Sequence, residues 1–108
     1  MATPIPDNRA AFSLEELIEA TGAIVRAGEH GAVSGVATDS RADVAGKLFV
    51  ALTGDRFDGH DFVADVVRRG AHGVVVSRDV EVPGLASVLR VGDTLGALGG
   101  VARFHRRR

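Results

Sequence analysis

The sequence predicts a single α/β domain in which helices flank a mixed β-sheet. The chain has 108 residues, which is enough to bury one hydrophobic core but not two. Its middle part contains segments in the order strand, helix, strand, which is typical of an α/β crossover unit. Helical patterns also occur near both ends of the sequence. Together these observations favour one sheet with helices packed on it.

The first helix is predicted just after the N-terminus. Residues 1–12 contain two prolines and a mixed polar set, and we expect them to form a flexible arm. Ser13 and Glu16 have the spacing of a capping box, and Gly22 stands just past the expected end of the helix. The domain itself is therefore expected to span residues 13–108.

Five segments are predicted to be β-strands. Short β-branched runs at residues 24–25 and 33–38 are separated by a glycine-containing turn. Residues 47–52 are nearly continuous in apolar character, as expected for a strand covered on both faces, and we place them at the centre of the sheet. Residues 73–77 and 87–91 indicate two further strands.

The second helix is predicted between two of these strands. Val63 and Val67 repeat at four-residue spacing, which places them on one face of a helix. Arg68 and Arg69 stand in the expected last turn, where positive charge is favourable, and Gly70 follows. This pattern makes the segment the clearest helix in the chain.

The third helix is expected to begin after Asp93, a residue type that caps helix N-termini. Leu95, Leu98 and Ala102 then form an apolar stripe at helical spacing. Three glycines within the segment weaken it, so we expect this helix to need tertiary support.

Composition and charge exclude several classes of protein. Hydrophobic residues make up 45% and charged residues 25% of the chain, which argues against extensive disorder. The net charge of -1 provides no overall field for nucleic acid or an anionic membrane, so neither is expected as a partner. Cysteine is absent and no apolar stretch has membrane length, so a cytoplasmic protein is the simplest interpretation.

The sequence predicts no metal site and no nucleotide-binding phosphate loop. His30, His72 and His105 are scattered along the chain, and no other His or Cys stands near His60 with ligand or triad spacing. The pattern G-x-x-x-x-G-K-[ST] does not occur, so the chain cannot by itself be a P-loop ATPase.

A first polar cluster, "TDSR", follows one of the predicted strands. The hydroxyls of Thr38 and Ser40 can donate and accept hydrogen bonds. Asp39 can accept from an imide or ribose donor, and Arg41 can pair with a phosphate. At the C-terminal end of a strand, this set suits the crevice in which open α/β sheets bind ligands. The alternative is that Asp39 and Ser40 only cap a turn and Arg41 is solvated.

A second cluster, "GDRFDGH", follows the next strand. Gly54 permits close backbone approach, Phe57 offers a ring face for stacking, and Arg56 offers a planar fork for phosphate. The helix that follows adds free N–H groups and a partial positive charge. Clusters on successive strand ends can line the same edge of a sheet, so we expect the two to form one pocket.

The alternative for this second loop is purely structural. Asp58 or Asp61 would then cap the following helix, Phe57 would fill a gap under the loop, and His60 would lie on the surface. For His60, a helix-cap or structural role is favoured over acid–base catalysis, because no suitable partner residue stands near it in the sequence.

Five motifs occur in order along the chain: "TDSR", "GKLFVALTG", "FDGHDF", "GAHGVVVSR" and "VGDTLGALGGVARFHRR". With these motifs at this spacing, the chain resembles the N-terminal domain of the Mur ligases over roughly residues 13–105. The form "FDGHDF" is more similar to the members that join D-alanyl-D-alanine to UDP-N-acetylmuramoyl-tripeptide. In the relatives that add the third residue, Phe57 and His60 commonly differ.

The resemblance implies that the domain binds the uridine diphosphate end of a substrate of an ATP-dependent ligase in peptidoglycan precursor synthesis. In that family a central P-loop domain binds ATP with magnesium, and a C-terminal domain helps to bind the incoming amino acid or dipeptide. The implied substrate-binding residues are Thr38, Ser40, Arg41, Gly54, Asp55, Arg56 and Phe57.

The family's ATP-binding and C-terminal domains have no counterpart in these 108 residues. We therefore expect the chain alone to be inactive, with no catalytic residue, metal or cofactor of its own. Its expected partners are the UDP-N-acetylmuramoyl-peptide substrate and the ATP-binding domain of the same ligase. The alternative is a stand-alone interaction or regulatory module that uses the same fold to dock a partner.

Overall fold

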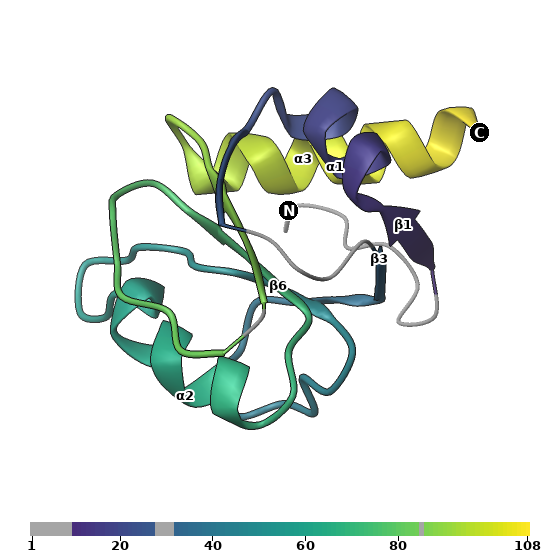
Figure 1. Cartoon of the computed structure of the whole chain (residues 1–108). Helices are drawn as coiled ribbons and strands as arrows, with labels where there is room; N and C mark the ends of the chain where they lie inside the picture. Colours follow the sequence, from purple (N-terminus) through teal and green to yellow (C-terminus); the bar gives the residue numbers. More distant parts are fainter. Residues whose placement is uncertain (1–9, 28–31, 85) are drawn as a thin grey trace.

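The computed structural model describes residues 10–27, 32–84 and 86–108. It contains a five-stranded mixed sheet, a separate two-stranded sheet, and helices on both sides of the larger sheet (Figure 1). The predicted fold class is therefore confirmed.

The strands are β1 (Ala11–Ser13), β2 (Ile24–Ala27), β3 (Ala32–Ser34), β4 (Val36–Ala37), β5 (Leu48–Val50), β6 (Gly73–Val76) and β7 (Ser87–Arg90). In the larger sheet they follow the order β2–β7–β6–β5–β4. Strands β4 to β7 run parallel, whereas β2 pairs antiparallel with β7 at one edge. Strands β1 and β3 form the small antiparallel sheet.

The helices in the described ranges are α1 (Leu14–Thr21), α2 (Val63–Arg68) and α3 (Thr94–Arg107). A single 3₁₀ turn, Gly59–Phe62, precedes α2, so the predicted second helix begins in a tighter conformation than expected. Figure 1 shows α1 and α3 side by side on one face of the larger sheet and α2 on the opposite face.

The core lies on both faces of this sheet. Successive side chains of a strand point to opposite faces, so Leu48 and Val50 join the cluster under α1 and α3. Phe49 and Ala51 join the second cluster, which α2 covers. All residues of β5 are buried, as the continuous apolar run predicted.

The centre of the sheet, however, is β6 and not β5. The prediction that residues 47–52 form the central strand was therefore wrong. The reason is that β7 adds beside β6 and β2 adds beside β7, so two strands lie beyond β6 on that side and two on the other. Both β5 and β6 are fully buried, and burial alone does not distinguish them.

The predicted strand at residues 33–38 is two strands that belong to different sheets. The chain turns at Gly35, which has a φ of 99°, and its N–H donates to the Ala10 carbonyl. Strand β3 on one side of the turn pairs with β1, where Phe12 is 1% exposed. Ala10 to Phe12 are thus part of the folded domain, which corrects the expected start at Ser13. The rest of the predicted arm and the glycine-containing turn lie outside the described residues.

The predicted capping box at the start of α1 is present. The Ser13 hydroxyl accepts from the Glu16 N–H at 3.1 Å, and the Ser13 N–H donates to Glu16 Oε1 at 2.9 Å. Gly22 ends the helix in the left-handed conformation, as its position predicted.

Helix α3 begins as predicted, because the Asp93 carboxylate accepts from the Leu95 N–H at 3.1 Å. Leu95 itself is 53% exposed, which corrects its place in the predicted apolar stripe. The buried face is formed mainly by Ala97, Leu98, Val101 and Ala102.

Gly100 explains how a helix with three glycines packs tightly. A Cβ atom at this position would lie 2.3 Å from the carbonyl oxygen of Ala20 in α1. Glycine therefore allows the two helix backbones to approach each other, and this contact is the tertiary support that the sequence predicted for α3.

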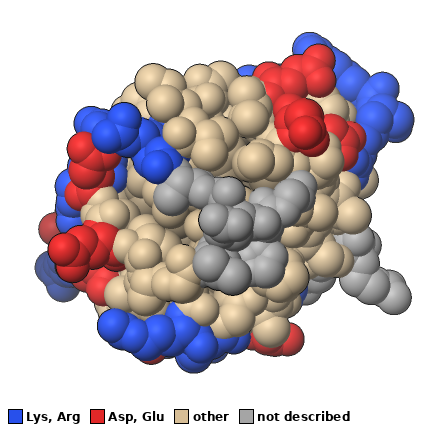
Figure 2. Space-filling view, in the orientation of Figure 1, with Lys and Arg blue, Asp and Glu red and all other residues tan. Residues whose placement is uncertain are grey.

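Charged side chains of both signs are interspersed around the rim of the face in Figure 2, without a continuous field of one sign. No helix in the described part of the chain is both long enough and apolar enough to cross a membrane.

Because β4 to β7 are parallel, their C-terminal ends meet at one edge of the sheet. The loops that follow these strands carry both polar clusters of the sequence.

Candidate functional site

A hollow of about 450 Å³ lies between the loops after β4 and β5. Residues 38–41 line it from the first loop, Phe57 lines it from the second, and Phe62 lines it from the 3₁₀ turn that follows. Phe49 and Leu52, at the end of β5, complete much of its apolar wall. The hollow therefore combines hydroxyl and charged groups with apolar surface, as small-molecule sites do.

The pairing of β4 with β5 brings these loops together. Val36 lies opposite Leu48 and Ala37 opposite Phe49 in a parallel ladder, so the two strands end within one residue of each other. The sequence predicted that two neighbouring strand ends would share one pocket, and the structure places both loops around one hollow.

The seven predicted binding residues do not all line this hollow. Thr38, Ser40, Arg41 and Phe57 do, whereas Gly54, Asp55 and Arg56 belong to the same loop as Phe57 but lie outside the lining. Binding by any of these residues remains a prediction.

Asp39 and Arg41 form a compact turn. The Asp39 carboxylate accepts from the Arg41 backbone N–H at 2.9 Å and from its guanidinium Nε and Nη2, each at 3.1 Å. These hydrogen bonds lower the pKa of Asp39, and the carboxylate raises the pKa of Arg41. Both groups are charged near neutral pH, so Arg41 is partly neutralised by its own turn.

The loop after β5 depends on a close backbone approach at Gly59. The Gly59 N–H donates to the Leu52 carbonyl at 2.7 Å, and a Cβ atom there would lie 2.9 Å from both the N and the O of Leu52. A second bond, from the Gly54 N–H to the Phe57 carbonyl at 2.9 Å, closes the turn. The Phe57 side chain is left 57% exposed, with a ring face available beside the hollow.

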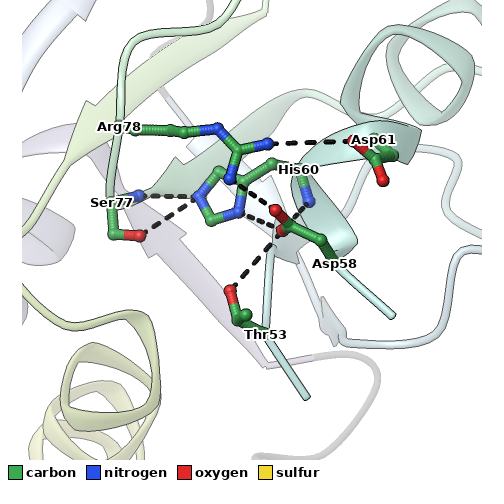
Figure 3. A network of polar contacts seen from close by, with 6 residues as sticks. All are labelled: Thr53, Asp58, His60, Asp61, Ser77 and Arg78. Atoms are coloured by element: carbon green, nitrogen blue, oxygen red, sulfur yellow. Dashed lines mark hydrogen bonds and ion pairs between the residues drawn. The ribbon is translucent and has the colours of Figure 1, made fainter. Parts of the chain in front are cut away.

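His60 connects this loop to the end of β6 (Figure 3). Its side chain is fully buried, with Nδ1 2.6 Å from Asp58 Oδ1, and Nε2 accepts from the Ser77 backbone N–H at 2.9 Å. Because an amide N–H can only donate, Nε2 carries the lone pair and Nδ1 carries the proton that it donates to Asp58.

The order Asp58, His60, Ser77 resembles a catalytic triad, and the Ser77 hydroxyl lies 3.3 Å from Nε2. The lone pair of Nε2 is already used by the Ser77 N–H, so His60 has no free site to act as a base towards this hydroxyl. His60 thus has the structural role that the sequence favoured. It is buried, which corrects the alternative that placed it on the surface.

Asp58 is the acceptor at the centre of this network. It caps the 3₁₀ turn by accepting from the His60 backbone N–H at 2.9 Å, and its other oxygen accepts from Arg78. The hydrogen bond from Arg78, with those from the backbone and ring of His60, lowers the pKa of Asp58 well below its usual range. Arg78 also lies 3.8 Å from Asp61, which supports the same turn.

Arg69 was assigned only to a helix end by sequence reasoning, but it reaches the first loop. Its Nη2 donates to the Ser40 carbonyl and its Nη1 to the Ala42 carbonyl at 3.3 Å, while Nε pairs with Asp65 at 3.0 Å. Ala42 and Ser40 are 27 and 29 residues away from Arg69 in the sequence, and no local pattern indicates such a contact.

A second hollow, of about 460 Å³, adjoins the first and was not predicted. The two hollows share Leu52 and Phe57. Thr53, Ser77 and Thr94 bring three hydroxyl-bearing residues to the second one. Within the described ranges, no three His, Cys, Asp or Glu residues gather closely enough to hold a metal ion.

Residues 32–105 match the family model described as Mur ligase family, catalytic domain. The chain belongs to the Mur ligase family. Among curated relatives, it is 40% identical over 79 residues to the UDP-N-acetylmuramoyl-tripeptide--D-alanyl-D-alanine ligase of Synechocystis sp., with 70% of this chain and 17% of that protein aligned. It is 45% identical over 69 residues to the UDP-N-acetylmuramoyl-L-alanyl-D-glutamate--2,6-diaminopimelate ligase of Aquifex aeolicus, with 62% and 14% aligned.

Solved structures agree with the fold. The crystal structure of MurF from Acinetobacter baumannii superposes with a TM-score of 0.82 at 31% identity, covering 94% of this chain and 22% of that one. The resemblance to the Mur ligases inferred from five motifs is therefore confirmed. This Mur ligase domain spans less than a fifth of the length of either curated relative.

Proposed function

We propose that this domain binds the uridine diphosphate end of a UDP-N-acetylmuramoyl-peptide for a Mur ligase. The observation that carries the proposal is the single hollow shared by the loops after β4 and β5. It places an exposed aromatic ring opposite a turn with two hydroxyls and a guanidinium, the groups that a nucleotide needs for stacking and hydrogen bonding.

Each side chain then has a definite role. Ser40 and the backbone of residues 54–57 bind uracil or ribose, and Phe57 forms an apolar wall against the base. Arg41 or Arg56 lies near the diphosphate. Arg41 lines the hollow but is already held by Asp39 through two hydrogen bonds, whereas Arg56 lies outside the lining and has no carboxylate partner among the described residues.

The parent enzyme in this proposal adds D-alanyl-D-alanine to UDP-N-acetylmuramoyl-tripeptide in the cytoplasm. The "FDGHDF" motif and the likeness to MurF support this choice over addition of the third residue. In the complete ligase, ATP with magnesium would phosphorylate the peptide carboxylate and leave ADP, and attack of the dipeptide amine on the acyl phosphate would form the amide bond and release phosphate. The present residues would anchor the nucleotide, and remote binding of this kind helps to position the distant reacting end.

Binding of UDP to the 108-residue protein tests the proposal. Titration with UDP, followed by amide NMR, should shift the signals of residues 38–41 and 54–57 most strongly. ADP serves as the control, because the larger purine should not fit the same hollow in the same way. Shifts that are equal for both nucleotides, or that lie away from the two loops, would contradict the proposal and favour an interaction module.

The double substitution Ser40→Ala with Arg56→Ala should raise the dissociation constant for UDP by roughly tenfold or more, because it removes hydrogen bonds that include a charge-assisted one. Arg106→Ala is the matched control, since it removes an arginine that is also exposed, from the far end of α3. Calorimetric titration measures both constants. An equal loss in the two proteins would mean that only overall charge matters.

A further inference from the structure

We propose that Arg69 is a positioning residue. It holds the turn at residues 39–42, here called the Ser40 turn, in the conformation that binds the nucleotide. The inference rests on the proposed nucleotide site but adds a residue that lies outside it. Arg69 follows α2, on the side of the sheet that the second core cluster occupies, and does not line the hollow.

The geometry of Arg69 is that of a clamp, by which we mean a side chain that ties the Ser40 turn to the end of α2. Three of its nitrogens are engaged, one by a carboxylate of α2 and two by main-chain carbonyls of the turn. Asp65 lies four residues earlier and holds Nε, so the guanidinium plane has a defined orientation before it reaches the turn. The planar fork of arginine can bridge the carbonyls of Ser40 and Ala42 together, whereas a lysine ammonium is a single point.

The Ser40 turn has little other support. Strand β4, which precedes it, is two residues long and lies at the edge of the sheet. The hydrogen bonds of Asp39 to Arg41 and of the Ala42 N–H to the Asp39 carbonyl are internal to the turn. In the part of the chain that the structure describes, Arg69 provides the side-chain hydrogen bonds that connect this turn to another element.

Arg69 therefore acts on the site through the backbone. Its bonds occupy the carbonyls of the turn, while residues 38–41 line the hollow. Without the clamp, those two carbonyls can bond to water and the turn becomes free to sample other conformations. A nucleotide would then have to order the turn on binding, and this cost lowers its affinity.

The test compares Arg69→Gln with Arg68→Gln in the 108-residue protein. Both substitutions remove one positive charge from the same end of α2, but the Arg68 side chain makes no hydrogen bond or ion pair with the residues that the structure describes. We expect Arg69→Gln to weaken UDP binding about tenfold, the cost of ordering roughly one residue, and Arg68→Gln to change it less than about twofold. Arg69→Lys, which keeps the charge but not the fork, should fall between them.

Amide hydrogen exchange without nucleotide gives a readout that does not depend on the proposed function. The Arg41 and Ala42 amides should exchange about tenfold faster in Arg69→Gln than in the unsubstituted protein, with a similar melting temperature for both. Unchanged exchange in Arg69→Gln would overturn the inference, whether or not UDP binds. If UDP binds neither protein while exchange rises as expected, the nucleotide site is wrong and the clamp stands.

Discussion

Asp58 shows how much one side chain organises at this site. Its carboxylate accepts from Arg78 and from both the backbone and the ring of His60. Through these bonds it connects the loop that carries Phe57 to the residues that follow β6 (Figure 3). The same donors lower the pKa of Asp58, with Arg78 as the largest cause.

This lowered pKa predicts how stability depends on pH. A carboxyl group whose pKa is lower in the folded than in the unfolded state stabilises the fold. This contribution is fully present when the pH is above the unfolded-state pKa, here 3.8, and it is lost as the pH falls through the folded-state pKa. The difference in unfolding free energy between the unsubstituted protein and Asp58→Asn should therefore be largest near neutral pH and should narrow below about pH 4. Urea unfolding at several pH values measures it.

Asp55→Asn is the control for this prediction. It makes the same chemical change in the same loop, at an exposed residue whose side chain makes no hydrogen bond within the described part of the chain. We expect its unfolding free energy to follow that of the unsubstituted protein at every pH. A difference for Asp58→Asn that stayed constant from pH 7 to acidic pH would show that ionisation of Asp58 is not the stabilising feature.

At the scale of elements, the contact between α1 and α3 gives two neighbouring glycines of α3 opposite expected effects on stability when each is replaced by alanine. Replacing a helical glycine by alanine usually stabilises a protein by about 0.5–1 kcal/mol. That gain is expected for Gly99→Ala, because the new methyl group would meet only the end of the flexible Arg103 side chain, at 3.4 Å. Gly100→Ala should instead destabilise by about 1–3 kcal/mol, since its methyl group would collide with the Ala20 carbonyl.

Denaturant unfolding of the two variants measures this contrast directly. The pair is closely matched, since both glycines occupy consecutive positions in the same helix. Equal stabilisation by both substitutions would mean that the helix backbones lie further apart than the structure shows.

At the scale of the whole molecule, the two core clusters should unfold together. Residues of β5, β6 and β7 contribute to both, because alternate side chains of each strand point to opposite faces of one sheet. Val66→Ala in α2 and Leu98→Ala in α3 should each cost about 2–4 kcal/mol and shift one shared transition. The chain has no Trp or Tyr, so methyl NMR in urea is a suitable probe. Different midpoints for the two faces would contradict this expectation.

Much of the candidate site could be predicted because it depends on local chemistry. Hydroxyl, carboxylate and guanidinium groups after one strand, and glycine with an aromatic ring after the next, were sufficient to indicate one pocket at a sheet edge. Arg69 and Ser77 could not be found in this way, because their partners are 17 or more residues away. The second hollow was not predicted either, because it is formed by α3 and by loops that follow three different strands.

By itself, the sequence determined the fold class of this Mur ligase domain and most of its elements, but not β1. The capping box at Ser13, the cap at Asp93 and the apolar runs of β5 and β6 are local signals, because each depends on residues a few positions apart. Tertiary structure alone decided which strand is central, where the run at residues 33–38 breaks, and how Arg69 and His60 tie the loops to other elements. Those outcomes depend on contacts between distant parts of the chain, and such contacts leave no periodic pattern in the sequence.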